Sequence, residues 1–161
     1  MGLFSKKKKA EPVTPQPTVV KRPMSQLTFK VAGISNYKSA IEKLAEDHEN
    51  DWYTATVKEI REAMMDDEKI YQYDFNVQKV LLVDEPDNQF DKNAIKVIAD
   101  GEHIGYVPKT KCKQVKEISA SKEIKSIHCN LYGGKYKIVT SGTEKGETEY
   151  GASIDIFYYD D

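Results

Sequence analysis

The spacing of hydrophobic side chains after residue 70 constrains this chain more than any other feature of its sequence. Over 71–77, apolar and aromatic side chains alternate with polar ones, and this period of two predicts a half-buried strand. The apolar members are Tyr71, Tyr73, Phe75 and Val77. The apolar run 80–83 continues the segment, so we expect one strand over 71–83 with 80–83 buried on both faces.

Similar short segments recur along the chain. Strands are predicted over 27–34, 94–98, 103–107, 124–132, 136–140 and 152–158. Asp100-Gly101 is a type I′ hairpin signal, Gly133-Gly134 is interpreted as the turn of a second hairpin, and 141–150 as a polar loop. The expected core residues include Tyr73, Val80, Leu82, Ile95 and Val97.

Helical spacing appears in two places. Between 36 and 68 it predicts a helix from Asn36 to about Asp47 and a short helix near 56–65, which begins with a Thr56/Glu59 capping box. A basic helix over 110–119 should turn Cys112, Val115 and Ile118 inward. The fold class is therefore α+β and mainly antiparallel β, with about six strands in a closed or nearly closed barrel and two or three helices outside.

The charge distribution separates a tail from the folded part. Residues 1–26 hold six Lys or Arg side chains and one acidic side chain, a net charge of +5. Because the whole chain has a net charge of −2, residues 27–161 carry a net charge of −7. Four prolines lie in the same segment, which predicts a disordered, basic, Pro-rich tail over 1–26 and a domain over 27–161 with a helical insert at about 36–68. The tail has two interpretations. It is either solvated, or it binds weakly to anionic lipid or nucleic acid through Lys6–Lys9 and the neighbouring Leu3 and Phe4.

Several classes of protein are excluded by composition. No run of about 18 apolar residues exists, so a membrane-spanning helix is not expected. Two cysteines, Cys112 and Cys129, are too few and too far apart for a disulfide framework or a cysteine-rich zinc site. Because disulfide frameworks are typical of secreted proteins, the sequence predicts a cytoplasmic protein.

The segment 81–109, LLVDEPDNQFDKNAIKVIADGEHIGYVPK, is the most informative part of the sequence. It contains an E-P-x-N-x-aromatic-D-x-N-A-I-x-V block, a short hairpin, and an I-G-Y-hydrophobic-P-K block. The residues that carry these blocks are Glu85, Pro86, Asn88, Phe90, Asp91, Asn93, Ala94, Ile95, Val97, Ile104, Gly105, Tyr106, Val107, Pro108 and Lys109. The segment resembles the HIRAN domain family, which includes the N-terminal domain of helicase-like transcription factor and small stand-alone bacterial and phage proteins.

The resemblance implies an OB-like six-stranded β-barrel that binds single-stranded DNA and takes its free 3′ end into a pocket. Asn88 and Asp91 could hydrogen-bond a 3′-hydroxyl, because a carboxylate accepts and an amide both donates and accepts. Phe90 and Tyr106 offer flat faces on which bases could stack. The candidate phosphate contacts are Lys109 and Lys30, with Lys111, Lys113 and Lys116 on the basic helix.

Each of these residues also has a structural interpretation. Asn88 and Asp91 could cap backbone N–H groups in a turn, as Asx residues do. Phe90 could fill the core between strands, Tyr106 could be a half-buried strand residue, and the lysines could be a solvated helix face. Phe29-Lys30 stands where family members tend to carry an Arg–aromatic pair, so one stacking surface differs here.

Two other classes of function compete with DNA binding. A metal-dependent nuclease would need Asp87 beside the Glu123-Ile124-Lys125 triplet, whereas an adaptor would dock a partner protein through the helical insert or through Tyr150, Phe157, Tyr158 and Tyr159. We expect a non-catalytic module without cofactor or metal. Its expected partner is single-stranded DNA, in DNA repair, replication or a mobile-element setting, with a protein partner as the alternative.

Overall fold

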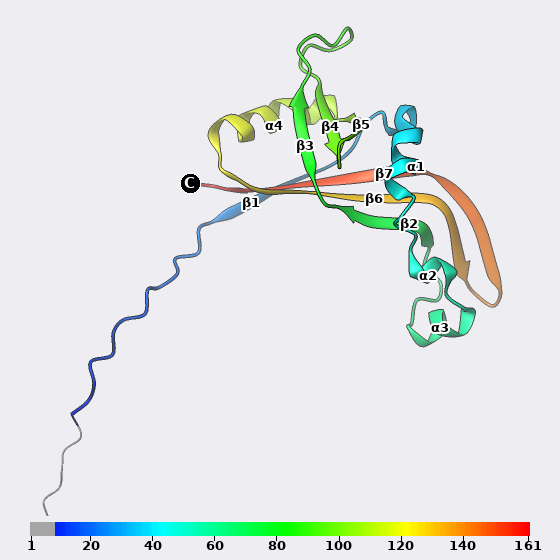
Figure 1. The fold of residues 1–161 in the computed structure, drawn as a ribbon, viewed down its shortest axis with the longest axis horizontal. Helices are drawn as coiled ribbons and strands as arrows, with labels where there is room; N and C mark the ends of the chain where they lie inside the picture. Colours follow the sequence, from blue (N-terminus) through cyan, green and yellow to red (C-terminus); the bar gives the residue numbers. More distant parts are fainter. Residues whose placement is uncertain (1–8) are drawn as a thin grey trace, which may run out of the picture.

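The computed structural model describes residues 9–161, which form two antiparallel sheets with helices around them (Figure 1). The strands are β1 (Met24–Lys30), β2 (Ile70–Val77), β3 (Val80–Asp84), β4 (Ile95–Ala99), β5 (Glu102–Tyr106), β6 (Ile124–Val139) and β7 (Thr143–Tyr159). The helices are the 3-10 turn η1 (Ile34–Tyr37), α1 (Lys38–Ala45), α2 (Asp51–Thr54), α3 (Val57–Glu62) and α4 (Lys109–Ser121).

The larger sheet has the order β1-β7-β6-β2, and its centre is the long β6–β7 hairpin. The predicted turn at Gly133-Gly134 and the predicted loop over 141–150 are both wrong. β6 continues through the two glycines, whose positive φ values of 121° and 76° accompany a shift of register between Tyr132 and Gly134. Glycine pairs in a strand can therefore mark a bulge where the sequence suggests a turn.

The smaller sheet has the order β3-β4-β5. β3 pairs with β4, and the predicted Asp100-Gly101 hairpin is confirmed, with φ values of 43° and 84°. The single strand expected over 71–83 is wrong, because the chain passes from the larger sheet to the smaller one between β2 and β3. Asp100 fixes this corner: its Oδ1 accepts the Lys79 N–H at 2.8 Å, and its own N–H donates to the Lys79 carbonyl at 2.8 Å.

The change of sheet also alters burial. Leu81 and Val83 are 48% and 43% exposed, so 80–83 is not buried on both faces as predicted. Val80, Ile95 and Val97 are core residues as expected, whereas Tyr73 and Leu82 are only half-buried. The main core lies around the two sheets and α4, and includes Leu27, Phe29, Ile104, Val115, Leu131, Ile154 and Ile156.

The α+β class with mostly antiparallel strands is confirmed, but the closed six-stranded barrel is not what residues 9–161 form. They form two open sheets, and a single antiparallel bridge between Ala32 and Tyr106 links the end of β1 to β5. Both backbone hydrogen bonds of this bridge are present, at 2.8 and 2.9 Å. On the opposite side β2 and β3 do not pair, so the strands do not close on themselves.

The helices agree more closely with the sequence. α4 buries Cys112, Val115 and Ile118 as predicted. The capping box that starts α3 is confirmed: the Thr56 hydroxyl accepts the Glu59 N–H, and the Glu59 carboxylate accepts the Thr56 N–H. α2 and α3 lie beside the far end of the β6–β7 hairpin (Figure 1), where Ile60, Ile70 and Val139 form a small separate core.

The N-terminal segment meets the fold at Arg22. Its guanidinium binds Asp161 at 2.8 Å and Glu123 at 2.9 Å, and lies 3.8 Å from the centre of the Tyr159 ring. Residues 9–23 are exposed and have no regular secondary structure. The tail predicted over 1–26 therefore overlaps β1, which begins at Met24, and Lys6–Lys8 lie outside the described residues. No helix within 9–161 is long and apolar enough to cross a membrane.

Candidate nucleic-acid interface

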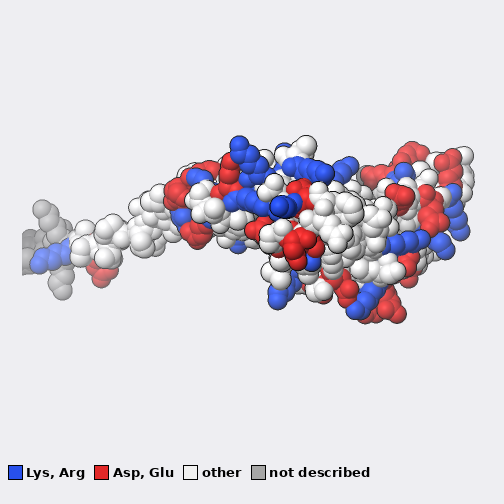
Figure 2. Space-filling model, turned by 90° about the horizontal axis from the view of Figure 1, so that it is seen from above, with Lys and Arg blue, Asp and Glu red and all other residues white. Residues whose placement is uncertain are grey.

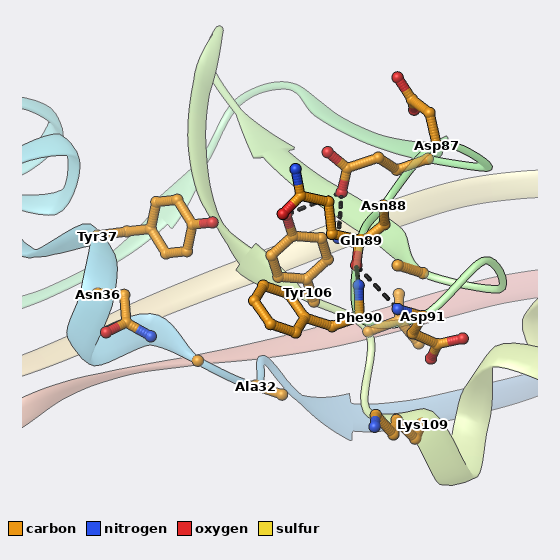
Figure 3. Close-up of a pocket in the computed structure, with 14 residues that line it drawn as sticks. Ala32, Asn36, Tyr37, Asp87, Asn88, Gln89, Phe90, Asp91, Tyr106 and Lys109 are labelled. Atoms are coloured by element: carbon orange, nitrogen blue, oxygen red, sulfur yellow. Dashed lines mark hydrogen bonds between the residues drawn. The ribbon is translucent and has the colours of Figure 1, made fainter.

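A groove of about 610 Å³ opens beside the bridge that joins the two sheets (Figure 3). One wall is the segment from Ala32 to Tyr37, which leads into α1. The facing wall is the loop between β3 and β4, and the floor comes from Tyr106 and Val107 at the end of β5. Lys109, the first residue of α4, closes one end. Five of the six predicted contact residues therefore meet in one place: Asn88, Phe90, Asp91, Tyr106 and Lys109.

The loop between β3 and β4 is shaped by its own polar side chains. Asn88 Oδ1 accepts the N–H groups of Phe90 and Asp91, both at 2.9 Å, and Asp91 Oδ1 accepts the Asn93 N–H at 2.9 Å. These are Asx turns, so the structural interpretation of Asn88 and Asp91 is confirmed. The same bonds hold Phe90 and Asp91 at the groove. A structural role and a role in binding are therefore compatible for Asp91.

Glu85 is the centre of the polar network in the groove. The motif contains Glu85, but the sequence did not indicate this central position. Glu85 Oε2 accepts the Asn88 Nδ2–H and the Tyr106 hydroxyl, both at 2.8 Å, and Lys96 Nζ lies 3.2 Å from Oε1. The hydrogen bond from Asn88, then that from Tyr106, lowers the pKa of Glu85, since both stabilise the charged form. The carboxylate thereby ties the loop to β5.

The aromatic side chains occupy two kinds of position. Phe90 is 93% exposed, so its interpretation as a core residue is wrong. Tyr106 is half-buried, and its ring meets those of His103 and Tyr37 at centroid distances of 4.9 and 6.2 Å. The neighbouring Tyr37 hydroxyl, followed by burial and Glu85, raises the pKa of Tyr106 above its ordinary value, so this phenol stays protonated and donates.

Tyr37 is a second groove residue that sequence analysis missed. It lies within the helix predicted from Asn36 to about Asp47, and nothing in the local sequence shows that η1 packs against β5. Lys30 is exposed on β1 and does not line the groove. Asp87 lines the groove, whereas Glu123 binds Arg22 near the C-terminus, so the nuclease pair is not brought together.

Replacing Glu85 by glutamine should change how stability depends on pH. Because the folded-state pKa of Glu85 lies below its ordinary value of 4.5, its contribution is fully present above that value. The contribution is lost as the pH falls from 4.5 through the lower folded-state pKa. Urea unfolding between pH 6 and 3 should therefore show a shallower loss of stability for Glu85→Gln than for the natural chain. Identical acid profiles for the two proteins would contradict the network.

The geometry is that of a ligand-binding module, with an open groove that has aromatic side chains, carboxylates and lysine around it. Comparison with protein families agrees with the sequence motif: residues 66–145 match the HIRAN domain model. The match covers β2 to the start of β7, while β1, the helices α1–α3 and most of β7 lie outside it. Neither the curated proteins nor the solved structures give a match. The chain belongs to the HIRAN domain family, whose members are generally modules that bind nucleic acid, in particular single-stranded DNA.

Proposed function

We propose that this protein binds the 3′-hydroxyl end of single-stranded DNA in the groove, without catalysing a reaction. The observation that carries the proposal is the pairing of Phe90, an almost fully exposed aromatic ring, with the carboxylate of the adjacent Asp91. An exposed ring next to a polar groove is the arrangement on which a terminal base stacks. The setting we propose is DNA repair, replication or a mobile element.

Selectivity for the end follows from charge. Three carboxylates, Glu85, Asp87 and Asp91, line the groove, against a single lysine, Lys109. Asp91 uses Oδ1 for the Asn93 N–H, and within residues 9–161 its Oδ2 makes no hydrogen bond, so Oδ2 can accept a 3′-hydroxyl. A phosphate at the same place would meet the carboxylates and be repelled, which disfavours a 3′-phosphate and an internal nucleotide.

The direct test compares three strands of equal sequence and length, which carry a 3′-hydroxyl, a 3′-phosphate or a closed circular backbone. Fluorescence anisotropy titrations should give the tightest binding for the 3′-hydroxyl strand. Equal affinities for all three strands would mean that the protein binds DNA but does not recognise its 3′ end. No binding to any strand would remove the proposed function itself.

Replacing Phe90 by alanine should weaken binding without changing stability. Loss of one stacked base costs about 1–3 kcal/mol, which corresponds to about a 5- to 150-fold rise in Kd. Because stacking does not involve the end group, 3′-hydroxyl and 3′-phosphate strands should be affected alike.

A matched control for this variant is Trp52→Ala, which removes a 41% exposed aromatic side chain from α2. It should leave DNA binding unchanged. A lower melting temperature for Phe90→Ala, or an equal loss of binding for Trp52→Ala, would contradict the role of Phe90.

Trp52 also supports the second candidate function, that of an adaptor for a partner protein. Trp52 and Met64, which is 84% exposed, present apolar surface on the helical insert outside the HIRAN match. The C-terminal aromatic side chains support this function less, because Tyr150 and Tyr158 pack against the main core and Tyr159 stacks with Arg22.

A further inference from the structure

Helix α4 concentrates positive charge in a domain that is acidic as a whole. It carries four lysines, Lys109, Lys111, Lys113 and Lys116, and one acidic residue, Glu117. Figure 2 shows basic side chains across the middle of the molecule, in the part that carries α4, while acidic side chains predominate at the end with α2, α3 and the β6–β7 hairpin. Because α4 begins at the groove, the positive charge of this helix lies at one end of the groove.

A second hollow of about 390 Å³ continues from the groove onto α4. Its lining consists of Asp91, Asn93, Lys109, Cys112, Lys113, Lys116 and Glu117. Asp91 and Lys109 also line the groove, so the two hollows adjoin at these residues. Lys109, Lys113 and Lys116 follow one another at helical spacings of four and three, and therefore form a row about 10 Å long on one face of α4.

The lysines of this row are available to a ligand. The side chain of Lys113 is 89% exposed, and its nearest carboxylate, that of Glu117, is 3.9 Å away. Lys116 lies 3.7 Å from Asp84, at a similarly loose distance. Exposed ion pairs of this kind contribute little to stability, so a phosphate can replace the carboxylate at small cost.

A separate hollow beside η1, which shares no lining residue with the groove, has the reverse charge. Its volume is about 310 Å³, and its charged residues are Lys38, Glu147 and Glu149. Two carboxylates against one lysine disfavour a phosphate backbone there, whereas three lysines against two carboxylates favour it along α4. Charge thus favours a path for the phosphate backbone along α4, which adjoins the groove, over one beside η1.

We infer that a strand whose 3′ end occupies the groove leaves it along α4, where Lys113 and Lys116 contact the phosphates on its 5′ side. This inference rests on the proposed function, and adds to it a second subsite and a direction for the bound strand. It predicts that the site extends beyond the terminal nucleotides, and that the extension is electrostatic and tolerant of sequence.

The test uses the full chain and two oligothymidine strands with 3′-hydroxyl ends, of about 4 and about 12 nucleotides, which span the usual range of site sizes for such modules. Affinity is measured as a function of salt for the natural chain and for the double variant Lys113→Gln/Lys116→Gln. Each lost phosphate contact lowers the salt slope by about 0.7, so the slope for the long strand should fall by about 1.4. The short strand should be bound as before.

A matched double variant, Lys38→Gln/Lys58→Gln, removes the same charge from exposed sites on α1 and α3. It should change neither slope. An unchanged long-strand slope in the α4 variant overturns the inference, as does a reduced slope in the matched variant. In both cases, binding of the short strand would leave the proposed function standing. Failure of the natural chain to bind either strand would remove both.

Discussion

Replacing Asp91 by alanine should raise the Kd for a 3′-hydroxyl strand by about 10- to 150-fold, the equivalent of about 1.5–3 kcal/mol for a hydrogen bond with a charged group. The same variant should cost much less on a 3′-phosphate strand, because removing the carboxylate also relieves repulsion. Anisotropy titrations with the two strands measure this difference directly. An equal loss on both would mean that Asp91 only shapes the loop.

The structural role of Asp91 requires a companion variant. Asp91 Oδ1 accepts the Asn93 N–H at 2.9 Å, so alanine also removes a turn contact. Asp91→Asn keeps an acceptor for that N–H and removes the charge. It should therefore retain the melting temperature of the natural chain and improve binding of the 3′-phosphate strand. If Asp91→Asn discriminates between the two ends as well as the natural chain does, the carboxylate is not the source of selectivity.

The second large effect is expected at Gly105, where β5 meets the end of β1. Gly105 has a φ of 151°, and a Cβ atom there would lie 2.5 Å from both the Ala32 carbonyl oxygen and Val31 Cγ1. Backbone strain and overpacking each cost about 1–3 kcal/mol, so Gly105→Ala should destabilise the fold by about 2–6 kcal/mol. Urea unfolding measures this loss.

Gly142 provides the control for Gly105. It lies in the turn between β6 and β7, has no positive φ, and leaves open space around an added Cβ. Gly142→Ala should change the free energy of unfolding by less than about 0.5 kcal/mol. Because the Ala32–Tyr106 bridge also forms the groove, Gly105→Ala should weaken DNA binding as well. Stability equal to that of Gly142→Ala would contradict the close approach of the two segments.

The groove shows how far sequence analysis reaches at a functional site. The motif contained Asn88, Phe90, Asp91, Tyr106 and Lys109 at fixed spacing, and the fold brings these residues together. The family followed from the same motif, and the match over 66–145 confirms it. The central position of Glu85 did not follow, because its partner Tyr106 lies 21 residues away and reaches it only when β5 lies beside the loop.

The sequence by itself determined those features whose contacts lie close along the chain. The hairpin at Asp100-Gly101, the buried face of α4 and the capping box of α3 depend on neighbours within a few residues, so local pattern and turn chemistry were sufficient. The tertiary structure alone decided how strands far apart pair. It divided 71–83 between two sheets, extended β6 through Gly133-Gly134 into a long hairpin with β7, and placed Tyr37 against Tyr106. The physical reason is that a period of two specifies a strand and its buried face, whereas the partner of that strand is selected by packing across the whole core.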